Sequence, residues 1–249
     1  MISQDFFDDK ILEKIVNRFY GYGNYQGNYW FIGMEEAGGN FQEINNRINI
    51  WSDRGEQEIE DIAEFHEAIG YGASFKSNAR LDVPVWNKII RILLSAKGQE
   101  NIDIEDVRQY QISKLGRRNQ ETCLLELFPL PSTSLKHWIY SERSRLSYLC
   151  NRETYEEHFL ETRINHISER IKECHQLKAV IYYGIGYEYS WRKITKKIGD
   201  IDFLWRSEGF FIGKNAQTVF VIAKHPATKG LTNEYFHKIG ISIAEKLAD

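Results

Sequence analysis

Four short apolar runs, each followed by glycine or proline, constrain the fold of this chain more than any other feature. The runs are YWFIG at 29–33, CLLELF at 123–128, AVIYY at 179–183 and TVFVIA at 218–223. Apolar runs without strict alternation are typical of strands buried on both faces. Helical patterns separate them, so the sequence predicts an α/β fold, a three-layer α/β/α sandwich with a mostly parallel central sheet of about four strands.

Apolar residues at helical spacing predict the layers that cover this sheet. Helices are expected at about 11–19, 58–70, 84–98, 104–116, 153–176, 187–198 and 233–247, and Gly21 and Gly23 are expected to stop the first one. DFLW and GFFIG predict an antiparallel excursion before the last run. With 42% hydrophobic residues the chain can bury one continuous core, so we expect residues 1–249 to form a single domain.

Charge and cysteine content limit the classes of function. The 35 acids exceed the 32 bases, so a polyanion would have to meet a local patch, because the molecule has no overall cationic field. The three cysteines are widely spaced, which favours a reducing cytoplasm and predicts neither a disulfide framework nor a metal site. No apolar run approaches the roughly 20 residues that span a bilayer. We therefore expect a cytoplasmic protein with no membrane, metal or cofactor.

The site is predicted at the carboxyl ends of the strands, where open α/β sheets bind ligands. The four strand ends read GMEEAGG, PLPSTS, GIGYEY and KHPATKG. The first carries Glu35 and Glu36, and the last carries His225 directly before Pro226, which holds the backbone extended. Gly33 would let a ligand approach the backbone.

Each of these acidic and basic groups has two interpretations. Glu35 and Glu36 are either turn acids near a helix N-terminus or a catalytic carboxylate, Glu35, beside a structural neighbour, Glu36. His225 either bonds to nearby backbone or donates a hydrogen bond to a developing anion. Basic runs such as SWRKITKK and AKHPATKG are either solvated faces or a phosphate track at the crevice.

Other phosphate-binding motifs are weak. GIGYEY lacks the third glycine of a dinucleotide fingerprint, because Tyr189 stands in its place. GYGNYQGNY and GYGASF lack the lysine and hydroxyl of a P-loop, and their composition is typical of surface turns. The sequence therefore predicts no classical nucleotide-phosphate cradle.

Three segments, FIGMEEAGG, LLELFPLPS and VIAKHPATKGL, follow one another in an order that resembles the uracil-DNA glycosylase superfamily. The resemblance covers the chain from about Tyr29 to its end. It implies an α/β/α sandwich, a role in DNA repair, and hydrolysis of the N-glycosidic bond of a base flipped out of the DNA stack.

The resemblance also implies roles for individual residues. Glu35 falls where a water-activating carboxylate lies and His225 where a base-contacting histidine lies, so these two are the catalytic candidates. The candidates for substrate binding are Gly33, Met34, Glu36, Phe41, Glu126 and Leu231. Among them, Leu231 is either the wedge that fills the vacated stack or an apolar contact before the last helix. Phe41 is either a stacking residue or, the interpretation we favour, a core aromatic.

Two departures from the family pattern keep three hypotheses open. Glu126 stands near the place of a base-reading asparagine, and an ionised glutamate only accepts hydrogen bonds; Ala227 stands where serine is common. The first hypothesis is a glycosylase acting on a damaged or modified base in single- or double-stranded DNA. The second is a noncatalytic nucleic-acid, nucleobase or nucleotide-binding protein. The third is an unrelated α/β protein that binds a small metabolite.

Overall fold

The computed structural model describes residues 6–79, 81, 83–134 and 137–249. This part of the chain contains one mixed sheet of eight strands in the order β3-β1-β4-β2-β5-β8-β7-β6. The strands are β1 Gly21–Gly23, β2 Tyr29–Gly33, β3 Ile59–Glu60, β4 Thr122–Glu126, β5 Ala179–Tyr183, β6 Leu204–Arg206, β7 Phe210–Lys214 and β8 Val219–Ala223.

The centre of the sheet confirms the predicted strands. β4, β2, β5 and β8 are neighbours and run parallel. The expected count of about four strands is wrong, because β3 and β1 extend the sheet beyond β4, and β7 and β6 extend it beyond β8. β1 and β7 each pair antiparallel with the central strand beside them. The strands β1 and β3 have only three and two residues, too few to show a periodic pattern.

The predicted role of Gly21 as a helix stop is also wrong. α1 (Asp9–Arg18) ends before this glycine, which pairs with Leu125 as part of β1. Gly21 has a φ of +142°, and a Cβ there would lie 2.1 Å from the Leu124 carbonyl oxygen. Glycine is required at this position because β1 approaches the backbone of β4 too closely for any side chain.

All seven predicted helices are present, with shifts at their ends. Beyond α1 they are α3 Ile62–Ala68, α4 Pro84–Ala96, α5 Ile104–Ser113, α7 Arg152–Glu173, α8 Glu188–Ile198 and α9 Asn233–Ala248. The sequence patterns predicted neither α6 Tyr140–Arg143 nor α2 Phe41–Asp53, although Asn40 and Glu43 form a capping box at the start of α2. The helix expected from residue 58 begins only at Ile62, because the residues before it form β3.

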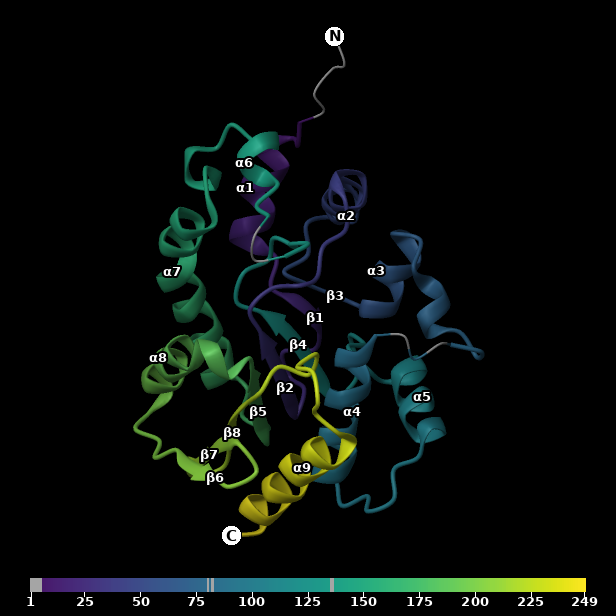
Figure 1. Cartoon of the computed structure of the whole chain (residues 1–249), viewed down its shortest axis with the longest axis vertical. Coiled ribbons are helices and arrows are strands. Elements are labelled where there is room, and N and C mark those ends of the chain that lie inside the picture. Colours follow the sequence, from purple (N-terminus) through teal and green to yellow (C-terminus); the bar gives the residue numbers. More distant parts are fainter. Residues whose placement is uncertain (1–5, 80, 82, 135–136) are drawn as a thin grey trace.

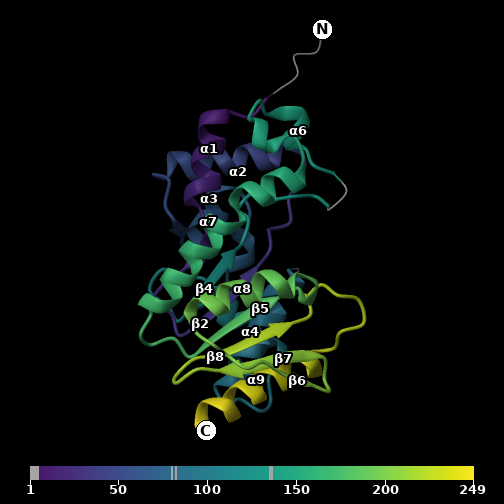
Figure 2. The same cartoon turned by 90° about the vertical axis from the view of Figure 1, so that its left-hand side faces the viewer.

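Helices lie on both sides of the sheet (Figure 1). α7 and α8 pack together on one side, and α4 packs with α9 and α5 on the other. The central strand β2 is buried along its whole length, including Trp30 at 0% exposure, which explains its apolar sequence. Figure 2 shows α1, α2 and α6 gathered at the end of the molecule remote from α9.

The register of the parallel strands brings their carboxyl ends to one edge. Gly33 is opposite Glu126 on β4, and Tyr183 is opposite Ala223 on β8. The loop after β8 carries His225 and projects from the molecule in Figure 2. In the described ranges of the chain, no helix is long and apolar enough to cross a membrane.

Candidate functional site

Gly33, Glu126 and Tyr183 make the closest contact at the carboxyl edge of the sheet. A Cβ on Gly33 would lie 2.5 Å from both Glu126 Oε2 and Tyr183 Cε2. The side chains from β4 and β5 therefore meet directly over the end of β2, in space that only glycine leaves open. There the Tyr183 hydroxyl donates a hydrogen bond of 3.0 Å to Glu126 Oε1.

Glu126 is held in conditions that favour its neutral form. Its Oε2 atom is buried and has no hydrogen-bond partner among the residues that the structure describes. Burial raises the pKa of Glu126 well above its usual range, and the negative charges of Glu36 and Glu35 raise it further. A protonated carboxyl group both donates and accepts hydrogen bonds, so Glu126 can present one donor and one acceptor.

His225 lies on the other side of Tyr183. The two rings are edge to face, with centroids 5.4 Å apart. The Ala227 N–H donates a 3.1 Å hydrogen bond to His225 Nδ1, so the neutral imidazole carries its proton on Nε2. Burial lowers the pKa of His225, which favours this neutral form. The arrangement makes Nε2–H a directed hydrogen-bond donor.

Glu35 is fixed by an ion pair from the start of α7. Arg152 Nη1 lies 2.5 Å from Glu35 Oε2, and both side chains are 16% exposed. Burial is the largest influence on the pKa of Glu35 and raises it, against the opposing effect of Arg152. Arg152 also donates to Ser132 Oγ at 2.6 Å, so it links the loops that follow β2 and β4.

Glu36 is fixed in a different direction. It accepts hydrogen bonds from Arg47 on α2 and from the Tyr22 hydroxyl on β1, the latter at 3.2 Å. Its charge nevertheless raises the pKa of Glu126 more than the charge of Glu35 does. Both carboxylates of the GMEEAGG loop therefore contribute to the field at Glu126, and each has its own arginine.

The remaining predicted residues, Met34, Phe41 and Leu231, lie in three different settings. The Met34 carbonyl accepts a 2.7 Å hydrogen bond from Phe128 N–H, which continues the pairing beyond β2 and β4. Phe41 is buried and packs against Phe7 at 4.8 Å, as a core aromatic would. Leu231 is half-buried against the core in the loop before α9. Met34 therefore belongs to the loop that carries Glu35 and Glu36, while Phe41 lies in the core beside α1.

The sequence patterns did not identify Tyr183 or Arg152 as site residues. Tyr183 ends the third apolar run, and its only signal was its place between strand ends that carry an acid and a histidine. Arg152 begins a long helix, and no local pattern connects it to Glu35, which precedes it by 117 residues.

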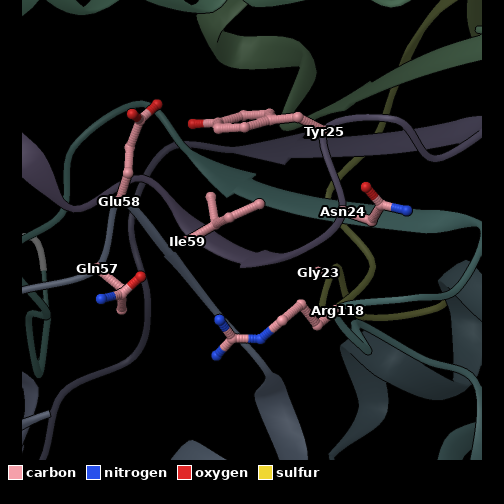
Figure 3. A pocket seen from close by; sticks show the side chains of 7 residues that line it. All are labelled: Gly23, Asn24, Tyr25, Gln57, Glu58, Ile59 and Arg118. Carbon is pink, nitrogen blue, oxygen red and sulfur yellow. The ribbon is translucent and has the colours of Figure 1, made fainter. Parts of the chain in front are cut away.

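A hollow of about 300 Å³ lies elsewhere, lined by Gly23, Asn24, Tyr25, Gln57, Glu58, Ile59 and Arg118. Gly23 pairs with Cys123 near the start of β4, so the hollow lies toward the amino ends of the parallel strands. Figure 3 shows the Tyr25 hydroxyl directed toward the Glu58 carboxylate, with Arg118 below them.

Both carboxylate oxygens of Glu58 in this hollow already have hydrogen-bond partners on α7. His166 Nε2 lies 2.5 Å from Glu58 Oε1, and Arg170 donates to both carboxylate oxygens at 3.0 and 3.2 Å. Burial alone would raise the pKa of Glu58, but the hydrogen bonds from these two residues outweigh it and lower the pKa to about 2. The cluster is a structural anchor between β3 and α7, so the group of Gly33, Glu126, Tyr183 and His225 at the opposite edge remains the candidate site.

Within residues 6–79, 81, 83–134 and 137–249, no group of three or more His, Cys, Asp or Glu side chains is arranged to hold a metal ion. Comparison of the chain with protein-family models, curated proteins and solved structures finds no match.

Proposed function

We propose that this protein is a divergent N-glycosylase, which hydrolyses the bond between a damaged or modified base and its sugar after the base is flipped from DNA. The observation that carries this proposal is the cluster in which Tyr183 bridges Glu126 and His225 over Gly33. It supplies donors and an acceptor for the polar edge of a base at the carboxyl ends of parallel strands.

Glu126 takes the role of a base-reading residue in this proposal. An asparagine would offer one N–H donor and one carbonyl acceptor to a base. A protonated Glu126 offers the same pair through Oε2–H and Oε1, although Tyr183 already occupies one lone pair of Oε1. The departure from the family pattern therefore keeps the capacity to read a base with both a donor and an acceptor face.

His225 and Glu35 carry the chemical step. Water attacks the anomeric carbon of the sugar, the C–N bond breaks, and its electron pair leaves with the base. Nε2–H of His225 donates a hydrogen bond to the negative charge that develops on the base. The ionised Glu35 carboxylate stabilises the cationic sugar and accepts a proton from the attacking water, while Arg152 holds that carboxylate in position.

One observation favours a noncatalytic alternative. The Arg152–Glu35 ion pair occupies one oxygen of the carboxylate that would activate water. A protein that used the same cluster to bind a nucleobase, nucleotide or nucleic acid without hydrolysis would need only Glu126, Tyr183 and His225. The two candidates share one binding site and differ in whether a bond is broken.

A glycosylase assay tests the proposal. Single- and double-stranded oligonucleotides that carry uracil, hypoxanthine or other modified bases are incubated with the protein, and abasic sites are scored by strand cleavage in alkali. We expect His225→Ala and Glu35→Gln each to lower the rate by 10²-fold or more. His175→Ala and Glu100→Gln are matched controls, because both residues are exposed and outside the site.

Two results would decide against hydrolysis. If no substrate of the panel gives abasic product, the glycosylase proposal is wrong, and retention of the same oligonucleotides would then support the noncatalytic alternative. If the two controls lose as much activity as the site variants, the loss arises from general instability and the assignment of roles fails. Binding of neither oligonucleotides nor free bases would leave the small-metabolite hypothesis.

A further inference from the structure

A strip of aromatic side chains lies on the surface of α8 and of the β6–β7 hairpin, beyond the strand β8 that leads to His225. Its members, called the aromatic strip below, are Tyr189, Phe203, Trp205 and Phe211. Trp205 is 55% exposed and Tyr189 is 70% exposed. The strip spans the outer face of α8 and one face of the β6–β7 hairpin, which lie together at one end of the sheet (Figures 1 and 2).

Contacts join Trp205, Phe211 and Phe203, while Tyr189 contacts a neighbouring lysine on α8. Trp205 and Phe211 are direct partners across β6 and β7, with ring centroids 4.7 Å apart. The Arg192 guanidinium lies 5.0 Å from the Phe211 ring and 4.9 Å from the Phe203 ring. One residue further along α8, Lys193 Nζ lies 5.0 Å from the Tyr189 ring and 3.7 Å from Glu161 on α7. Each cation therefore lies beside at least one aromatic ring of the strip.

Large apolar side chains are unusual on an edge strand, because an exposed strand edge invites aggregation. Trp205 is exposed on β6, which ends the sheet, and Leu204 on the opposite face of the strand is 60% exposed. The ring of Trp205 packs against Phe211 and does not belong to the cluster of buried core residues in the part of the chain that the structure describes. A binding role explains why so large a ring is kept in solvent.

The charge around the strip differs in sign from that of the whole chain. Residues 188–229 contain eight Lys or Arg and four Asp or Glu, whereas the complete chain has 32 and 35. Arg192 and Lys193 form exposed ion pairs with Glu188 and Glu161. Such pairs contribute little stability, so phosphate groups can replace the acids at small cost. The strip therefore suits a polyanion that has flat rings of its own.

The strip also lies close in the fold to the strand ends that carry Tyr183 and His225. Phe211 is opposite Ile222 on β8, three residues before His225. Tyr189 lies in the first turn of α8, which follows the end of β5 after one short 3₁₀ helix. A ligand that lies along the strip would pass the edge of the sheet at which Tyr183 and His225 meet.

We propose that the aromatic strip binds single-stranded nucleic acid, with unpaired bases stacked on Trp205 and Tyr189 and phosphates bound by Arg192 and Lys193. Base stacking on aromatic side chains requires bases that are not hidden inside a duplex. The inference rests on the proposed function where it connects the strip with the site at Glu126, Tyr183 and His225. It adds that the substrate is single-stranded. Binding to the strip itself does not depend on hydrolysis.

Equilibrium binding of a fluorescent oligo-dT strand, a matched duplex and inorganic polyphosphate tests the inference. We expect Trp205→Ala to weaken oligo-dT binding about 5- to 150-fold, because one base loses its stacking partner. Tyr71→Ala is the matched control, since Tyr71 is 52% exposed and lies outside the strip. Lys193→Ala should reduce the slope of log affinity against log salt by about 0.7.

Several results would overturn the inference. They are equal affinities of Trp205→Ala and Tyr71→Ala for oligo-dT, equally tight binding of polyphosphate, or a preference for the duplex. A dimer in solution that Trp205→Ala dissociates without changing oligo-dT affinity would assign the strip to self-association instead. If no abasic product forms but Trp205→Ala still weakens oligo-dT binding, the inference stands and only the proposed hydrolysis fails.

Discussion

Replacing Gly33 by alanine tests whether side chains from β4 and β5 really cross over the end of β2. The new methyl carbon would lie 2.5 Å from Glu126 Oε2 and Tyr183 Cε2. Ordinary contacts of this kind are about 3.5–4.0 Å, so both side chains must retreat by about 1 Å. Overpacking of this type costs about 1–3 kcal/mol, and loss of the Tyr183–Glu126 hydrogen bond adds about 0.5–1.5 kcal/mol.

We therefore expect Gly33→Ala to lower the free energy of unfolding by about 1.5–4.5 kcal/mol. For a chain of this size, that corresponds to a fall in the melting temperature of about 3–18 °C. Urea unfolding at constant pH, followed by circular dichroism, measures the difference in free energy directly.

The control for this experiment is Gly186→Ala, in the loop that follows the neighbouring strand β5. A Cβ on Gly186 meets no atom within 4 Å, so the same chemical change creates no clash. We expect this variant to stay within about 1 kcal/mol of the wild type. If Gly33→Ala and Gly186→Ala unfold at the same urea concentration, the close contact over Gly33 is absent and the geometry proposed for base recognition is wrong.

Three further substitutions test the surroundings of the site. Arg163 is buried and donates hydrogen bonds of 2.7–2.8 Å to the carbonyl groups of Phe19, Glu126 and Leu127. Arg163→Met should therefore lower the free energy of unfolding in urea by about 3 kcal/mol or more. A loss below about 1 kcal/mol would contradict this. The pKa of Glu58 is lowered to about 2, so its contribution is complete above its unfolded pKa of about 4.3 and is lost as the pH falls toward 2. Glu58→Gln should therefore cost about 1 kcal/mol at pH 7, after allowance for solvent screening, and much less at pH 2, where half of the native carboxylates are protonated. The pKa of Glu126 is raised, so ionisation opposes folding as the pH rises above about 4.3. The stability of Glu126→Gln relative to the wild type should thus increase from pH 4 to pH 8, and a constant difference would show that Glu126 is ionised in the fold.

Local sequence patterns were sufficient for the central elements of the fold. The apolar runs at β2, β4, β5 and β8 are continuous because these strands are buried on both faces, and burial of this kind leaves its mark on every residue of a strand. The helices α4, α7 and α9 likewise show the spacing that one buried face imposes. Local sequence patterns also placed Glu35 and His225 just after the ends of strands.

Only the tertiary structure decided how the polar groups at those ends are used. Glu35 pairs with Arg152, and Glu126 meets Tyr183 from a strand that begins more than fifty residues later. Such pairs depend on the register of the strands and on the position of a helix N-terminus. The periodicity of residues within one segment predicts neither of these. The raised pKa of Glu126 has the same origin, because it arises from burial and from the charges of Glu36 and Glu35, which only the fold brings near this carboxyl group.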